Sequence, residues 1–171
     1  MLRGINLGSR KRVAMADLRE LFADLGTEDV RTYVQSGNVV FRSGKREGAL
    51  RQAIEKAIHR SLGLDVTVVL RTKAQMAKVV SGNPFVKSGI EPATLHVTFL
   101  SEKPSARRIR ELAAPAGSDR FEVVGRDVYL RCRGGYGKSK LQNAFFEKQL
   151  GVAATTRNWK TVTTLAELAS S

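Results

Sequence analysis

The sequence is poor in the residues that would stabilise a secreted, membrane-bound or metal-dependent protein. Its 171 residues include one cysteine, Cys132, which excludes an internal disulfide and fits a reducing compartment, so we expect a cytoplasmic protein. No apolar run approaches the length of a membrane span, and no basic-then-apolar leader opens the chain. We therefore expect neither a membrane partner nor secretion.

Residues for catalysis are also scarce. Neither histidine, His59 or His96, has a Cys, Asp or Glu partner at metal-ligand spacing, so we expect no metal and no cofactor. No Ser/His/Asp set stands out, and Cys132 ends an apolar stretch as a packed thiol does. No residue is singled out as catalytic, and a role other than an enzyme is favoured.

Aromatic residues make up only 6% of the chain. RNA-recognition sheets stack bases on several aromatic side chains, but residues 38–43 offer only Phe41 and residues 127–132 only Tyr129. Any binding of nucleic acid should therefore use Arg and Lys contacts to phosphates.

Positive charge is abundant. The net charge is +13, and residues 126–160 carry eight basic and two acidic side chains. This excess favours an anionic partner, either nucleic acid or a phosphate-bearing ligand. General solubility is the alternative explanation.

Several phrases occur twice in the same order. Residues 38–43 (NVVFRS) return as 127–132 (DVYLRC), 18–21 (LREL) return as 109–112 (IREL), and Leu-Gly closes a helical run at 62–63 and at 150–151. The separations are 88 to 91 residues, which indicates a duplicated unit.

Hydrophobic periodicity predicts the same order of elements in each copy. Strands are expected at 2–6, 30–35, 38–42 and 66–70, with helices at 15–25 and 50–62, a βαββαβ order typical of ferredoxin-like units. A capping box at 72–75 predicts a connecting helix. A strand at 95–100 follows, then a helix that buries Ile109 and Leu112, strands at 121–124 and 127–132, and a helix at 141–150.

In the second copy we expect residues 155–158 to lead into a helix instead of forming a fourth strand. The fold class is thus α+β, with two tandem ferredoxin-like halves packed together. The first half spans 1–71, a connecting helix and loop span 72–93, and the second half spans 94–171.

Three phrases resemble a known family: residues 2–6 (LRGIN), 32–41 (TYVQSGNVVF) and 156–159 (TRNW). They resemble the signature of an uncharacterised bacterial family, domain of unknown function 1697, along essentially the whole chain. Members usually carry apolar residues before the first phrase, so a shortened first strand is expected here. The resemblance implies a small α+β bacterial protein and supplies no activity.

One loop is a candidate anion site. Residues 134–139 (GGYGKS) lie between a strand and a helix and resemble the end of a P-loop, although Cys132 stands where the full pattern needs glycine. A nucleotide hydrolase is therefore disfavoured. The glycines could let backbone amides converge on an anion, joined by Lys138, Ser139 and Lys140. The alternative is a connection that only turns the chain.

Two further groups of residues have both a structural and a functional interpretation. Arg157 and Asn158 precede the last helix; Asn158 can cap it, or both can bind a carboxylate or phosphate. Arg3, Asn6 and the cluster begun by Arg10 and Lys11 could form a basic rim, or could fix a turn and face water.

The favoured function is a non-catalytic module that binds an anion or nucleic acid. An enzyme acting on a phosphorylated or carboxylated metabolite in a cleft between the halves is the first alternative. A structural or protein-binding role is the second.

Overall fold

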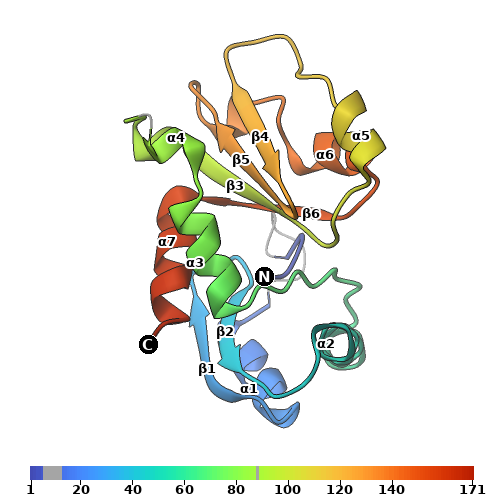
Figure 1. The fold of residues 1–171 in the computed structure, drawn as a ribbon. Coiled ribbons are helices and arrows are strands. Elements are labelled where there is room, and N and C mark those ends of the chain that lie inside the picture. The colour runs from blue at the N-terminus through green and yellow to red at the C-terminus, as the bar shows by residue number, and fades with distance from the viewer. Residues whose placement is uncertain (6–12, 88) are drawn as a thin grey trace. The chain divides into compact units, whose positions relative to one another are not determined.

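The computed structural model describes residues 1–5, 13–87 and 89–171. The chain divides into two compact units, Met1–Arg71 with Ser171 and Thr72–Ser170. Each contains helices and strands (Figure 1), which confirms the α+β class. Asn6, Arg10 and Lys11 lie outside the described residues, so the basic rim stays a prediction.

The first unit contains a two-stranded antiparallel sheet and two helices. Its elements are α1 (Met15–Asp24), β1 (Glu28–Tyr33), β2 (Asn38–Arg42) and α2 (Glu47–Leu62). Helix α1 buries Leu18, Leu21 and Phe22, whose spacing of three and four residues places them on one face. Helix α2 ends at Gly63, which has the left-handed conformation that glycine adopts without strain.

The two outer strands expected in this unit, at 2–6 and 66–70, are not formed as strands among the described residues. Leu2 and Val68 make one isolated antiparallel bridge, supported by a hydrogen bond of 2.9 Å from the Val69 amide to the Met1 carbonyl. The Leu2 amide also donates to the Gly37 carbonyl at 2.9 Å. So few residues pair here that the ladder does not reach the usual strand length.

The second unit contains four strands and most of the helices. Its elements are α3 (Lys73–Ser81), α4 (Pro84–Lys87), η1 (Pro92–Thr94), β3 (Leu95–Leu100), α5 (Ala106–Glu111), β4 (Arg120–Val124), β5 (Asp127–Arg131), η2 (Tyr136–Lys138), α6 (Asn143–Leu150), β6 (Ala154–Asn158) and α7 (Trp159–Leu168). The capping box is confirmed: Thr72 Oγ1 accepts from the Gln75 amide, and Gln75 Oε1 accepts from the Thr72 amide.

The sheet of the second unit is antiparallel, with the strand order β4-β5-β3-β6. All six residues of the central strand β3 are buried, because helices cover both faces. Helices α5 and α6 lie on one side of the sheet, and α3 and α7 lie side by side on the other (Figure 1). Leu100, Leu130 and Phe146 belong to the core beneath α5 and α6.

The expectation that the second half lacks a fourth strand is wrong. Residues Ala154–Asn158 form β6, which pairs with β3 from His96↔Asn158 to Leu100↔Ala154. The stretch Thr155-Thr156-Arg157-Asn158 has no apolar alternation, so its sequence alone favours a lead-in to the helix. Its threonines nevertheless suit an edge strand, and α7 starts directly after it at Trp159.

The helices of the described ranges were compared with the length and hydrophobicity that a membrane span requires. None of the helices found there is both long enough and apolar enough to cross a bilayer.

Candidate anion-binding site

Two loops of the second unit enclose a cavity of about 230 Å³. One loop, residues 115–119, precedes β4, and the other, residues 134–141, joins β5 to α6. Lys138, Ser139 and Lys140 line this cavity together with Gly134, Gly135 and Leu141. The structure thus brings the predicted lysines and serine together at one cavity, which we call the loop pocket.

The backbone of the 134–141 loop turns through a single 3₁₀ turn, η2. Gly135 begins it with a φ of +84°, a conformation that favours glycine, and its amide donates to the Cys132 carbonyl at 3.0 Å. Within the described residues, the amides of Gly134, Gly137 and Lys140 have no acceptor. These donors remain available to an anion or to water.

Crowding does not explain the glycines of this loop. A Cβ on Gly134, Gly135 or Gly137 would meet no atom within 4 Å. Of the three, only Gly135 has a positive φ, which requires glycine.

The inner side of the loop is fixed by buried groups. The ring of Tyr136 stacks on His96 of β3, with the ring centroids 5.0 Å apart and the planes inclined by 24°. The side-chain Nε2 of Gln142 donates to the carbonyls of Tyr136 and Ser139. Because these contacts hold the loop from within, Lys138 and Lys140 are displayed on a preformed surface.

The stacked pair is kept uncharged by burial. Burial lowers the pKa of His96, an effect that a hydrogen bond with the Thr94 backbone partly opposes. Burial also raises the pKa of Tyr136. Neutral, buried rings are suited to supporting the loop rather than to proton transfer.

Cys132 lies beneath the loop and is fully buried. Burial raises the pKa of its thiol, while a hydrogen bond with the Ser139 side chain acts in the opposite direction. Ser139 is itself buried, and its hydroxyl accepts a hydrogen bond from the Leu141 amide at 3.0 Å. Both side chains therefore stabilise the loop, as the packed-thiol interpretation of Cys132 expects.

The opposite wall of the loop pocket was not anticipated from the sequence. Arg120 Nη1 donates to the carbonyls of Gly117 and Asp119, at 3.2 Å and 2.9 Å. Asp119 Oδ1 accepts a hydrogen bond of 3.0 Å from the Arg133 amide, which ties this wall to the start of the 134–141 loop. Pro115-Ala116-Gly117-Ser118 has the composition of a loop, but nothing in it indicated which loop it would face.

The other predicted site residues lie elsewhere. Arg157 is not among the residues that line the loop pocket; its Nη1 donates to Thr155 Oγ1 and to the Thr156 carbonyl. Burial lowers the pKa of Arg157 to about 10, so it stays protonated at neutral pH. Asn158 Oδ1 accepts from the Thr161 amide at 2.8 Å and caps α7. Arg3 belongs to the first unit, where its amide donates to the Thr67 carbonyl.

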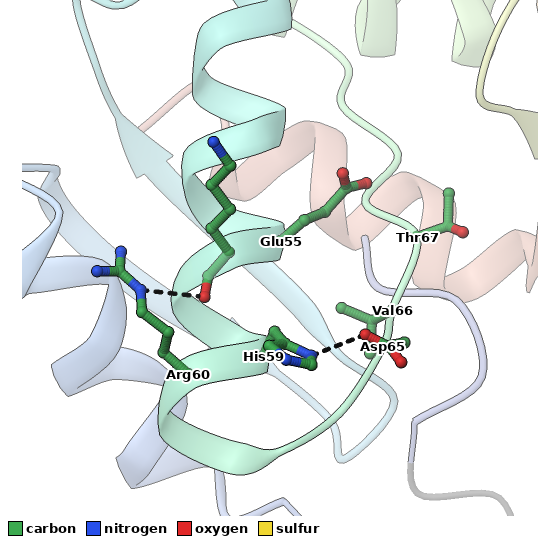
Figure 2. Close-up of a pocket in the computed structure, with 7 residues that line it drawn as sticks. Glu55, His59, Arg60, Asp65, Val66 and Thr67 are labelled. Carbon is green, nitrogen blue, oxygen red and sulfur yellow. Dashed lines mark hydrogen bonds and ion pairs between the residues drawn. The ribbon is translucent and has the colours of Figure 1, made fainter.

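A second cavity, of about 770 Å³, lies in the first unit between α2 and the segment after it (Figure 2). His59 Nδ1 and Asp65 Oδ1 are 2.8 Å apart, so His59 has a carboxylate partner that the sequence did not reveal. Glu55 Oε1 accepts from the Val68 amide at 2.9 Å. Across the described residues, no group of three or more His, Cys, Asp or Glu side chains could hold a metal ion.

Comparison with known proteins identifies the family. The family described as "Protein of unknown function (DUF1697)" matches residues 1–129, most of the chain, so the chain belongs to that family. No curated protein matches the sequence significantly.

A solved structure described as a conserved bacterial protein from Streptococcus pneumoniae is similar throughout. Its TM-score is 0.78 at 20% sequence identity, and the match covers 99% of this chain and 96% of that chain. At this identity the likeness concerns the fold. Neither description names a ligand, a partner or a reaction.

Proposed function

We propose that the protein is a non-catalytic binding module for a small phosphate-bearing anion, and that the loop pocket is its binding site. The observation that carries the proposal is the placement of Lys138 and Lys140 at one cavity, on a loop whose inner side is fixed by Tyr136 and Gln142. Two cations and unpaired amides on a preformed loop are the groups that bind phosphate in proteins.

The size of the cavity limits the ligand. Pockets for drug-sized molecules are roughly 300–1,000 Å³. At about 230 Å³, the loop pocket is suited to a phosphate group with a few further atoms, or to one end of a longer ligand.

The test is the affinity of inorganic phosphate, measured by isothermal titration calorimetry at low salt. We expect Lys138→Gln and Lys140→Gln each to weaken binding about tenfold, the equivalent of one charge-assisted hydrogen bond. Lys103→Gln is the matched control, because Lys103 is exposed and does not line the cavity. Equal losses in all three variants would mean that bulk charge attracts phosphate and that the pocket is not its site.

Nucleic acid is the alternative that the basic stretch 126–160 favours. A phosphate backbone would contact many surface cations, so its affinity should fall steeply as salt rises. Fluorescence anisotropy with a mixed-sequence oligonucleotide separates the two functions. Salt-sensitive binding that neither Lys138→Gln nor excess inorganic phosphate affects would assign the function to the surface as a whole.

An enzyme is favoured by one observation in the first unit. The carboxylate of Asp65 lies within hydrogen-bond distance of His59 Nδ1 (Figure 2). When Nδ1 donates its proton to Asp65, Nε2 is the ring nitrogen that could accept a proton from a ligand in the larger cavity. Both side chains are exposed, however, and the described cavity lining offers no serine or cysteine nucleophile. We therefore rank this function second.

We also propose that the two units are copies of one ferredoxin-like half. In the second unit the strands lie in the order β4-β5-β3-β6. In the first unit Leu2 contacts both the β1–β2 turn, at Gly37, and Val68, which supports the equivalent order with two shortened strands. An experimental structure in which residues 2–5 do not lie between β2 and residues 66–70 would disprove the duplication.

A further inference from the structure

The loop pocket contains one carboxylate among its cations, that of Asp119. We propose that Asp119 selects a phosphate monoester that carries a hydroxyl group close to its phosphate, the chemical class of sugar and polyol phosphates. This inference rests on the proposed function, because it assigns a preference to the same pocket.

Hydrogen bonds hold both the main-chain carbonyl of Asp119 and one of its two carboxylate oxygens. Its carbonyl accepts from Arg120 Nη1, and its Oδ1 accepts from the Arg133 amide. No described residue donates a hydrogen bond to Oδ2. The side chain is half-buried and Asp119 lines the cavity, so the hydrogen bond to Oδ1 restrains the carboxylate and leaves Oδ2 as the oxygen that can accept from a ligand.

A carboxylate at this position has opposite effects on two kinds of ligand. It repels a bare phosphate, because two negative charges within a small cavity disfavour each other. It stabilises a ligand whose hydroxyl donates to Oδ2, as acidic residues do for ribose hydroxyls in dinucleotide sites. Lys138 and Lys140 would then bind the phosphate, while Asp119 accepts a hydrogen bond from the hydroxyl group of the ester.

A purely structural role for Asp119 is the competing explanation, since Oδ1 already joins the two loops. Asp119→Asn separates the two roles. The asparagine oxygen can still accept from the Arg133 amide and the side chain keeps its shape, but the negative charge at Oδ2 is lost.

The experiment compares three probes by isothermal titration calorimetry: inorganic phosphate, propyl phosphate and glycerol 1-phosphate. The two esters have the same carbon chain and differ in their hydroxyls. We expect the wild-type protein to bind glycerol 1-phosphate about tenfold more tightly than propyl phosphate, the value of one hydrogen bond to a charged group. Asp119→Asn should reduce this ratio to about twofold or less and strengthen the binding of inorganic phosphate.

The outcomes are distinguishable. Equal binding of the two esters by the wild-type protein overturns the selection by Asp119 and leaves the phosphate site intact. A preference that Asp119→Asn does not change also overturns it. Failure of all three probes to bind removes both this inference and the proposed function. If circular dichroism shows that Asp119→Asn is unfolded, the affinities of the two esters for the wild-type protein test the inference by themselves.

Discussion

The β1–β2 and β4–β5 hairpins turn through glycines of similar conformation but in different surroundings. The φ angle is +72° at Gly37 and +63° at Gly125. A Cβ on Gly37 would lie 2.7 Å from Ile5 Cδ1 and 2.8 Å from Leu2 Cβ, whereas one on Gly125 would meet nothing within 4 Å. The first turn is therefore packed against the start of the chain. The second turn has open space beside its glycine and is tied to β3 by a hydrogen bond of 2.9 Å from the Leu100 amide to the Arg126 carbonyl.

The two turns differ because the two hairpins are stabilised by different neighbouring segments. The β4–β5 hairpin joins β3, a buried strand of six residues, through five paired positions of β5. The β1–β2 hairpin forms only a two-stranded sheet, and an isolated hairpin is marginally stable. Contacts of its turn with Leu2 and Ile5 supply burial that a full neighbouring strand would otherwise provide.

The largest expected effect comes from replacing the two turn glycines. Gly37→Ala should lower the free energy of unfolding by about 2–5 kcal/mol, because left-handed strain of about 1–2 kcal/mol adds to overpacking of about 1–3 kcal/mol. Gly125→Ala should cost only the strain, about 1–2 kcal/mol. Urea unfolding followed by circular dichroism measures both. Equal costs at the two positions would show that Leu2 and Ile5 do not confine the first turn.

The next effect concerns a tyrosine of the second hairpin at alkaline pH. Burial, with smaller contributions from Asp127 and Glu122, raises the pKa of Tyr129 from 10.0 to about 12. The folded state thus holds this proton more tightly than the unfolded state. The contribution of this proton to the free energy of unfolding is therefore fully present below pH 10 and is lost as the pH rises towards 12. The loss should be on the order of 2 kcal/mol.

Tyr129→Phe should make the free energy of unfolding fall less steeply between these two pH values. Urea unfolding at a series of pH values tests this, with Tyr33→Phe in the half-buried strand β1 as the control. The control removes a phenol but keeps every lysine, so it accounts for general alkaline effects. A slope in Tyr129→Phe as steep as that of the control would contradict the assignment.

The sequence predicted those parts of the fold that local patterns determine. The strand 38–42, the capping box at Thr72 and the helix end at Gly63 are confirmed at the positions expected. Each depends on residues close together in the chain. The strand β6 was missed because an edge strand needs only one partner, β3, which is more than fifty residues away and invisible in local alternation.

The candidate site was predictable to the same extent. The stretch 134–139 was recognised because glycines and a lysine are adjacent in sequence, and the structure places Lys138, Ser139 and Lys140 at one cavity. Asp119 was not recognised, because it reaches the pocket only through tertiary contacts such as that with the Arg133 amide. The stacking of Tyr136 on His96 has the same long-range origin.

The smallest expected effect tests the backbone of the first turn without crowding it. Val34 has a φ of +48°, which a β-branched residue rarely adopts, and it is 52% exposed. Val34→Asn should raise the free energy of unfolding by up to about 1 kcal/mol, because asparagine tolerates the left-handed region. Val124 is an exposed valine of the second hairpin for comparison, being 48% exposed at the end of strand β4. There the same substitution should be neutral or slightly destabilising, since valine suits an extended strand. Urea unfolding of both variants gives the comparison, and a destabilised Val34→Asn would show that the valine side chain contributes more than its backbone strain costs.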